Sequence, residues 1–309
     1  MNETEIRKIV EASLLAGRVD EVMDMAAPML RLIRSGDMGN EQPLGASRIG
    51  GLPDLPPGIT WPVDDGRPLD FIAQIDLAEA AAVAQLPDLP PSGRLAFFYD
   101  TDNQPWGFDP REREGWRVLY FEDDGATLQR VRPPAPVAST RPQPPGLLSR
   151  ILGRNPPPRI ADSLEPFPAN RVRFEAAISM PNLYEEFDQE FDSDLWDAVE
   201  DIMYKLDIEF DDPDHQLGGH PAQIQGDMKL ECQLASNGLY CGDGEAYESE
   251  QGLALKPGAA EWRLLLQIDS DEEGPGWMWG DLGCIYFWIR GSDLAARNFD
   301  NVWCVLQCS

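Results

Sequence analysis

The sequence has few basic residues. Its 309 residues include 25 Lys and Arg but 54 Asp and Glu, so the formal net charge is −29. Affinity for a nucleic-acid backbone depends on clustered Lys and Arg, and anionic membrane surfaces attract the same residues. The composition therefore predicts a protein that binds neither nucleic acid nor a membrane surface.

Long apolar runs and paired cysteines are also lacking. No stretch approaches the roughly 20 apolar residues that span a bilayer, and the opening Met-Asn-Glu-Thr-Glu does not resemble a secretory signal. Five cysteines are an odd, sparse set that does not indicate a disulfide framework. These features predict a cytoplasmic protein with reduced thiols.

Histidine is scarce, which limits metal binding and catalysis. The two histidines, His215 and His220, lie on either side of a Gly-Gly pair. They form only a weak candidate metal site, because their spacing to the nearest cysteines matches no standard zinc pattern. The sequence also has no Gly-x-Ser-x-Gly elbow, P-loop or dinucleotide fingerprint. We therefore expect no cofactor and favour a protein that is not an enzyme.

The hydrophobic pattern divides the chain into four segments. Residues 1–40 are predicted to be helical, because apolar residues recur at helical spacing from about residue 3 to 34. Residues 41–131 form a first β-rich half and residues 169–309 a second α+β half. Residues 132–168 hold 11 of the 28 prolines, which indicates a surface insertion or linker, or a docking segment for a proline-reading domain.

Seven segments have the pattern of short strands. They are Phe71–Leu77, Arg94–Tyr99, Arg117–Glu122, Arg171–Ile178, Trp262–Ile268, Cys284–Ile289 and Val302–Gln307. Apolar residues within Asn182–Leu206 recur at steps of three and four, which predicts an amphipathic helix or a helix pair with an acidic exposed face. We expect one compact α+β domain with N-terminal helices packed on two mainly antiparallel β halves.

An internal repeat relates the two halves. Three blocks recur in the same order: Ile49–Pro53 with Leu217–Pro221, Phe71–Asp76 with Leu264–Asp269, and Gly93–Phe98 with Gly283–Trp288. Three similar blocks in one order predict a duplicated strand–loop–strand unit. A pseudo-twofold relation between the halves is the expected arrangement.

The repeat contains a Gln/Asp pair in each half. Side chains two residues apart on a strand point to the same face, so a pseudo-twofold would direct both pairs toward one cleft. The candidate cleft residues are Gln74, Asp76, His220, Gln267 and Asp269, with Gly50, Gly51, Gly218 and Gly219 shaping its walls. Such a cleft predicts small-molecule binding or hydrolysis. In the alternative interpretation, these side chains hold the turns by hydrogen bonds to backbone N–H groups.

Two tryptophans are candidate partner-binding residues. Trp277 and Trp279 follow a Gly-Pro-Gly sequence and precede an apolar strand. Aromatic side chains exposed on a loop are typical of a binding surface. The alternative is that both indoles cover the end of the core.

The repeated blocks resemble a known family. Gly-Gly-Leu-Pro at residues 50–53, Trp61-Pro62 and the block at 71–77 resemble the YwqG-like family, a bacterial domain of unknown function, and residues 215–221 and 264–288 extend the likeness. The resemblance covers about residues 45–309. It implies an α+β fold and a bacterial cytoplasmic protein, and no established activity. Similar size and acidity in proteins encoded beside polymorphic toxins imply an immunity or interaction role.

Taken together, the sequence favours a non-enzymatic interaction protein. A basic protein partner is expected to be attracted by the negative charge and to dock on the aromatic loop. The alternative is a small-molecule-binding or hydrolytic domain with its cleft between the two repeats.

Overall fold

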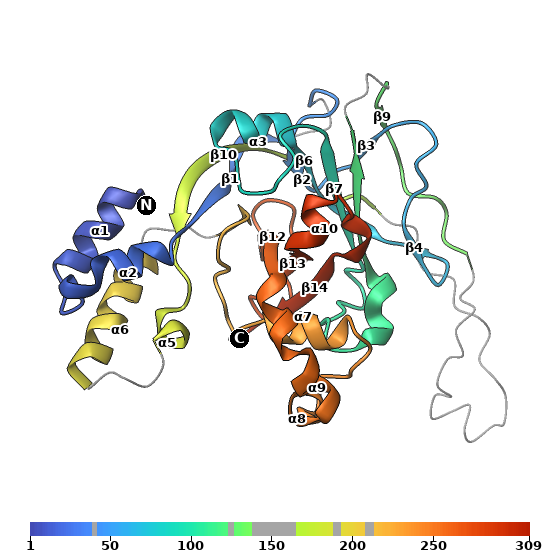
Figure 1. The fold of residues 1–309 in the computed structure, drawn as a ribbon. Helices are drawn as coiled ribbons and strands as arrows, with labels where there is room; N and C mark the ends of the chain where they lie inside the picture. The colour runs from blue at the N-terminus through green and yellow to red at the C-terminus, as the bar shows by residue number, and fades with distance from the viewer. Residues whose placement is uncertain (39–41, 123–126, 138–164, 188–192, 208–212) are drawn as a thin grey trace.

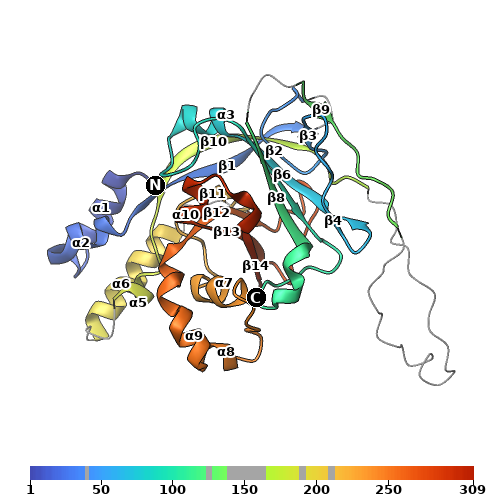
Figure 2. The same cartoon turned by 45° about the vertical axis from the view of Figure 1, so that its right-hand side comes forward.

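A computed structural model describes residues 1–38, 42–122, 127–137, 165–187, 193–207 and 213–309 (Figures 1 and 2). It combines helices with one large antiparallel sheet, which confirms the predicted mixed fold class. All seven predicted strands are present, and each end lies within one residue of the prediction.

Ten strands of the described chain form the large sheet, in the order β14-β13-β12-β11-β1-β10-β2-β6-β7-β8. Their bounds are β1 (Ala27–Met38), β2 (Arg48–Ile49), β6 (Asp70–Asp76), β7 (Arg94–Tyr99), β8 (Trp116–Phe121), β10 (Asn170–Ser179), β11 (Gln216–Leu217), β12 (Trp262–Asp269), β13 (Cys284–Arg290) and β14 (Trp303–Gln307). The long strands β1 and β10 pair at the centre, with Ala27 opposite Ser179.

Each of the two central strands pairs with a strand from the other half of the chain. The later strands of each half of the chain lie together, with β2, β6, β7 and β8 on one side of the centre and β11 to β14 on the other. However, β1 pairs with β11, and β10 pairs with β2. Each half of the chain therefore supplies one strand that is hydrogen-bonded to the other half.

The predicted helix over residues 3–34 is correct only for its first part. Helices α1 (Glu3–Glu11) and α2 (Val19–Asp24) are joined by the 3-10 turn η1 (Ala16–Arg18), but residues 27–38 form β1. The prediction is wrong there because Leu30 and Leu32 lie in the core and the backbone pairs with β10 and β11. A short apolar run fits both periodicities, and distant partners decide between them.

A small second core lies at one end of the molecule. Helices α5 (Leu183–Glu186) and α6 (Ser193–Asp207), the predicted helix pair, pack with α1 and α2 (left in Figure 1). The buried residues of this core include Ile6, Val10, Val22, Leu183, Val199 and Ile202. This cluster is separate from the main core, which is formed largely by the strands of the large sheet.

The large sheet curls so that its two ends meet. Phe97 on β7 contacts Phe287 on β13, with ring centroids 5.1 Å apart. On the outermost strands, Trp116 of β8 meets Trp303 of β14 at 5.0 Å, and the Trp116 indole donates to the carbonyl oxygen of Val302 at 3.0 Å. The aromatic side chains of both halves therefore share one core.

Shorter elements complete the fold. The other helices of the described residues are α3 (Leu77–Val83), α7 (Lys229–Ala235), α8 (Glu245–Glu248), α9 (Glu250–Leu255) and α10 (Gly291–Ala295), with 3-10 turns η2 (Pro110–Gly115), η3 (Lys256–Glu261) and η4 (Phe299–Asn301). Two small antiparallel pairs are β3 (Asp54–Leu55) with β9 (Gln129–Arg130), and β4 (Val63–Asp64) with β5 (Arg67–Pro68). None of the helices in the described segments is long and apolar enough to cross a membrane.

The proline-rich segment is described only at its ends. Residues 138–164 lie outside the described residues, so the predicted insertion or linker is not tested there. Residues 132–137 and 165–168 contain neither helix nor strand, in agreement with their proline content.

Candidate functional site

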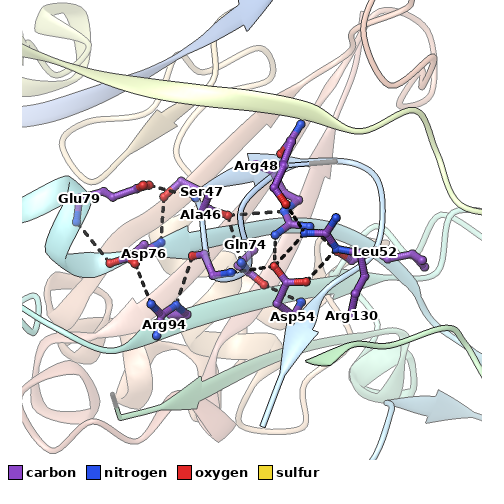
Figure 3. A network of polar contacts seen from close by, with 12 residues as sticks. Ala46, Ser47, Arg48, Leu52, Asp54, Gln74, Asp76, Glu79, Arg94 and Arg130 are labelled. Carbon is purple, nitrogen blue, oxygen red and sulfur yellow. Dashed lines mark hydrogen bonds and ion pairs between the residues drawn. The ribbon is translucent and has the colours of Figure 1, made fainter. Parts of the chain in front are cut away.

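Gln74 holds the first Gly-Gly turn (Figure 3). This β6 side chain is fully buried. Its Oε1 accepts a hydrogen bond from the N–H of Asp54 at 2.8 Å, and its Nε2 donates to the carbonyl oxygen of Ala46 at 3.0 Å. The side chain therefore ties the strand to the chain on both sides of the turn.

Gln267 does the same for the second turn. Its Oε1 accepts from the N–H of Ala222 at 2.9 Å, and its Nε2 donates to the carbonyl oxygen of Asp214 at 3.0 Å. Both glutamines thus use their amide groups within their own half. This is the geometry that the alternative sequence interpretation expects, in which these side chains hold the turns.

The two aspartates of the repeat are also engaged locally. The Asp76 carboxylate accepts from the N–H of Ala78 at 2.9 Å, which caps α3, and pairs with Arg94 at 2.9 Å. The Asp269 carboxylate accepts from the N–H of Asp214 at 2.9 Å and from that of Ser270 at 2.8 Å. Each carboxylate therefore has local donors that orient it.

A buried ion-pair network that the sequence analysis missed surrounds the first turn. Arg48 and Asp54 are almost completely buried and pair with each other, and Arg130 Nε lies 2.9 Å from the second Asp54 oxygen (Figure 3). Burial by itself would raise the pKa of Asp54, but the hydrogen bond from Arg130 and the charge of Arg48 hold this pKa below its usual value. The carboxylate is therefore ionised, and its charge is balanced by the two arginines inside the protein.

The histidines have separate partners. His215 is buried; its Nδ1 accepts from the N–H of Asp269 at 3.1 Å, and its Nε2 lies 3.4 Å from an Asp271 oxygen. The Nε2 of His220 lies 2.9 Å from the carbonyl oxygen of Met25, and burial lowers the pKa of His220. Within the described segments, no group of three or more His, Cys, Asp or Glu side chains is arranged to hold a metal ion.

Of the two interpretations of Trp277 and Trp279, the structure agrees with the alternative, in which both indoles cover the end of the core, and not with an exposed binding loop. Both indoles are buried, and both Nε1 groups donate to the carbonyl oxygen of Asp269 at 3.1 Å. Trp279 also contacts the ring of Tyr99, with centroids 5.7 Å apart. The two side chains fill the core between the halves, and they do not form an aromatic docking surface.

A pocket of about 440 Å³ lies between α6 and the segments at 214–216 and 220–223. Its lining includes Met29, Glu200, Met203, Tyr204, Asp214 and Gln223. His220 also lines it, whereas Gln74, Asp76, Gln267 and Asp269 do not. The structure therefore brings one of the predicted cleft residues to this pocket and leaves the two Gln/Asp pairs outside it.

Two buried oxygens in this pocket lack donors. Asp214 Oδ1 and Gln223 Oε1 are shielded from solvent, and neither has a hydrogen-bond partner in the part of the chain that the structure describes. Burial raises the pKa of Asp214, an effect that the charge of Arg31 opposes and the neighbouring Asp269 carboxylate increases. The sequence offered no signal for Gln223, because only folding brings it beside α6.

A partly buried carboxylate, Glu231 on α7, was also missed. The hydroxyl of Tyr247 donates to Glu231 Oε2 at 3.3 Å. Burial raises the pKa of Glu231 to about 7; the Tyr247 hydrogen bond opposes this rise and the Glu112 charge adds to it. This carboxylate lies outside the pocket beside α6.

The fold and the site define an α+β protein with one curled antiparallel sheet, in which a buried glutamine holds each Gly-Gly turn. A family model described as "Domain of unknown function (DUF1963)" matches residues 47–308. The chain belongs to this family. The match includes both turns but begins after α1, α2 and β1. No curated protein matches the chain.

Proposed function

We propose that this chain is a non-enzymatic binding protein whose target is a basic protein. The observation that carries the proposal is an acidic face on α5 and α6. Six exposed carboxylates form it: Glu185, Glu186, Asp194, Asp197, Glu200 and Asp201. Lys205, the basic residue of these helices, is already paired with Asp201 at 2.5 Å.

The mechanism follows from charge. A net charge of −29 attracts a basic protein over a distance that salt shortens. The acidic residues are concentrated on one pair of helices, so the basic partner is oriented toward these helices as the two proteins approach each other. The association rate constant is expected to fall as the salt concentration rises.

The proposal includes a bacterial, cytoplasmic, immunity-type role within the YwqG-like branch of the family. The residues that carry the YwqG-like resemblance lie within the matched region, 47–308. All five cysteines are free, which agrees with a reducing compartment.

We infer further that the two halves arose by duplication. Equivalent hydrogen bonds support this: Leu77 N–H to Gly93 O in one half and Ser270 N–H to Gly283 O in the other, each at 3.0 Å. Each glutamine also bonds the two ends of its Gly-Gly turn in the same way. The strand order, read outward from the central pair, agrees with a pseudo-twofold axis between β1 and β10.

A second candidate function is small-molecule binding. The pocket beside α6, at about 440 Å³, has the size of ordinary ligand sites. Hydrolysis by the Gln/Asp pairs is less well supported, because the local backbone and Arg94 already engage these side chains.

The test of the leading proposal is capture from the lysate of the source organism by two variants of equal charge. One variant neutralises the acidic face (Asp194→Asn, Asp197→Asn, Glu200→Gln, Asp201→Asn). The matched control neutralises four exposed carboxylates near α8 and α9 (Asp243→Asn, Glu245→Gln, Glu248→Gln, Glu250→Gln). The proposal expects one basic protein at about 1:1 with wild type and control, as for a specific interface, and its loss with the first variant. Equal loss with both variants would contradict it.

A further inference from the structure

We propose that the pocket between α6 and the segments at 214–216 and 220–223 receives a lysine or arginine side chain of the basic partner. This inference rests on the proposed function, and it names the chemical group that the acidic face is built to receive. The sequence indicated one residue of this pocket, His220, and assigned it to a cleft between the repeats and not to a partner-binding surface.

The polar part of the pocket is complementary to a ligand that donates hydrogen bonds. Asp214 Oδ1 and Gln223 Oε1 are both acceptors without donors among the described residues. Ammonium and guanidinium groups are donors only, and they carry the charge that a carboxylate prefers. An anionic ligand would add repulsion at Asp214, and a neutral apolar ligand would leave both oxygens unpaired.

The rest of the pocket fits the stem of such a side chain. Met29, Met180 and Met203 line it, and unbranched methionine side chains adapt their shape to an aliphatic chain. The two acceptor oxygens are shielded from solvent, so the proposed mode of binding requires neighbouring side chains to shift before the head group reaches them. Tyr184 and Tyr204, both exposed, add aromatic faces that attract cations.

The two Gly-Gly turns differ in their polar side chains. At the first turn, the Asp54 carboxylate is paired with the guanidinium groups of Arg48 and Arg130. The repeat aligns Arg48 with Gln216 and Asp54 with Ala222, so the second turn has no equivalent ion pair. Asp214 aligns with Ala46, and its Oδ2 lies 3.3 Å from Gln267 Nε2. The Asp214 carboxylate is therefore a feature of the second half alone.

The test is an NMR titration of the full-length protein. The probes are lysine and arginine capped at both ends, with capped norleucine as an uncharged probe. Asp214→Asn keeps an oxygen for Gln267 Nε2 and turns an NH₂ toward the pocket. Glu272→Gln is the matched control, because Glu272 is exposed, lies outside this pocket and loses the same charge. We expect the cationic probes to bind, norleucine to fail, and Asp214→Asn to weaken binding by about tenfold or more.

Binding of norleucine equal to that of lysine, or equal effects of Asp214→Asn and Glu272→Gln, would overturn the inference. So would a free diamine, cadaverine, that binds more tightly than both capped amino acids, because the pocket would then serve a small amine. Gln223→Leu removes the second acceptor, and it replaces Asp214→Asn as the test if that variant does not fold.

The two proposals fail in different ways. If the captured partner binds the Asp214→Asn variant as tightly as wild type, the pocket inference is wrong and the proposed function stands. If the pocket binds the capped cations but no basic protein is captured, the proposed function is wrong instead.

Discussion

Glu231 shows how one partly buried side chain links stability to pH. Its pKa is about 7 in the folded protein because of burial, against about 4.3 for an unperturbed glutamate. Since folding raises this pKa, the folded protein binds the Glu231 proton more tightly than the unfolded chain does, and protonation of Glu231 stabilises the folded state. The stabilising effect is complete below the unfolded pKa, and it is lost as the pH rises toward and through 7.

Glu231→Gln is therefore expected to stabilise the protein at alkaline pH. The amide avoids burying a charge, so the free energy of unfolding should exceed that of wild type by on the order of 2 kcal/mol at pH 8 and by little at pH 4.5. Urea unfolding at both pH values measures this. Glu245→Gln, at an exposed position on α8, is the control. A gain independent of pH would show that repacking, and not ionisation, is responsible.

Burial of single residues was the least predictable part of the site. The Gln/Asp pairs were recognisable because they recur at the same place in both repeats. The sequence left two interpretations of Trp277 and Trp279 open, because Tyr99, the partner that buries Trp279, lies 180 residues earlier in the chain. The pocket was missed for the same reason, since α6 and residues 220–223 approach each other only after folding.

At the scale of elements, the two Gly-Gly turns share their backbone conformation but not their surroundings. Gly50 and Gly218 both have positive φ, +65° and +69°. A Cβ at Gly50 would lie 2.2 Å from the backbone oxygen of Pro168, whereas one at Gly218 would meet only the end of the Leu86 side chain at 2.8 Å. A backbone carbonyl cannot move aside as a leucine methyl does.

Alanine at these two positions should therefore differ in effect. The positive φ costs both variants about 1–2 kcal/mol, and Gly50→Ala also forces the backbone near Pro168 to shift. We expect Gly50→Ala to lower the free energy of unfolding clearly more than Gly218→Ala, measured by chemical denaturation. Gly17→Ala, with open space around its Cβ, should change little. The reverse order would contradict the observed packing.

Element type was predictable wherever the pattern was local. Alternating apolar residues between Gly and Pro identified β6, β7, β8, β10 and β12 to β14. The central strand β1 was not recognised, because its apolar residues also fit a helix. What makes it a strand is pairing with β10 and β11, more than 130 residues later in the chain, and a local pattern carries no such information.

At the scale of the whole molecule, the exchange of β1 and β10 makes the halves interdependent. A fragment ending at Arg150 lacks the partners of β1, and the fragment that follows lacks the β2 partner of β10. Neither half contains the centre of its own sheet. Both fragments together contain every described strand of the large sheet.

We expect fragments 1–150 and 151–309 to be unfolded alone and to copurify in about a 1:1 ratio when co-expressed, because paired strands would join them. Size-exclusion chromatography and circular dichroism measure this. Leu32→Pro in the first fragment is the control; it removes the N–H that donates to His215 O at 2.8 Å and should prevent assembly. A folded single fragment would contradict the proposed interdependence.

The central place of β1 also affects how the protein is made. The ribosome synthesises β1 among the first 38 residues, yet its partners β10 and β11 follow only at residues 170–179 and 216–217. At the usual pace of synthesis, about 5–20 residues per second, β1 waits on the order of ten seconds for its first partner. During that interval its apolar side chains need shelter on the nascent chain or on a chaperone. The middle of the finished sheet therefore begins to form only after β6, β7 and β8 have been synthesised.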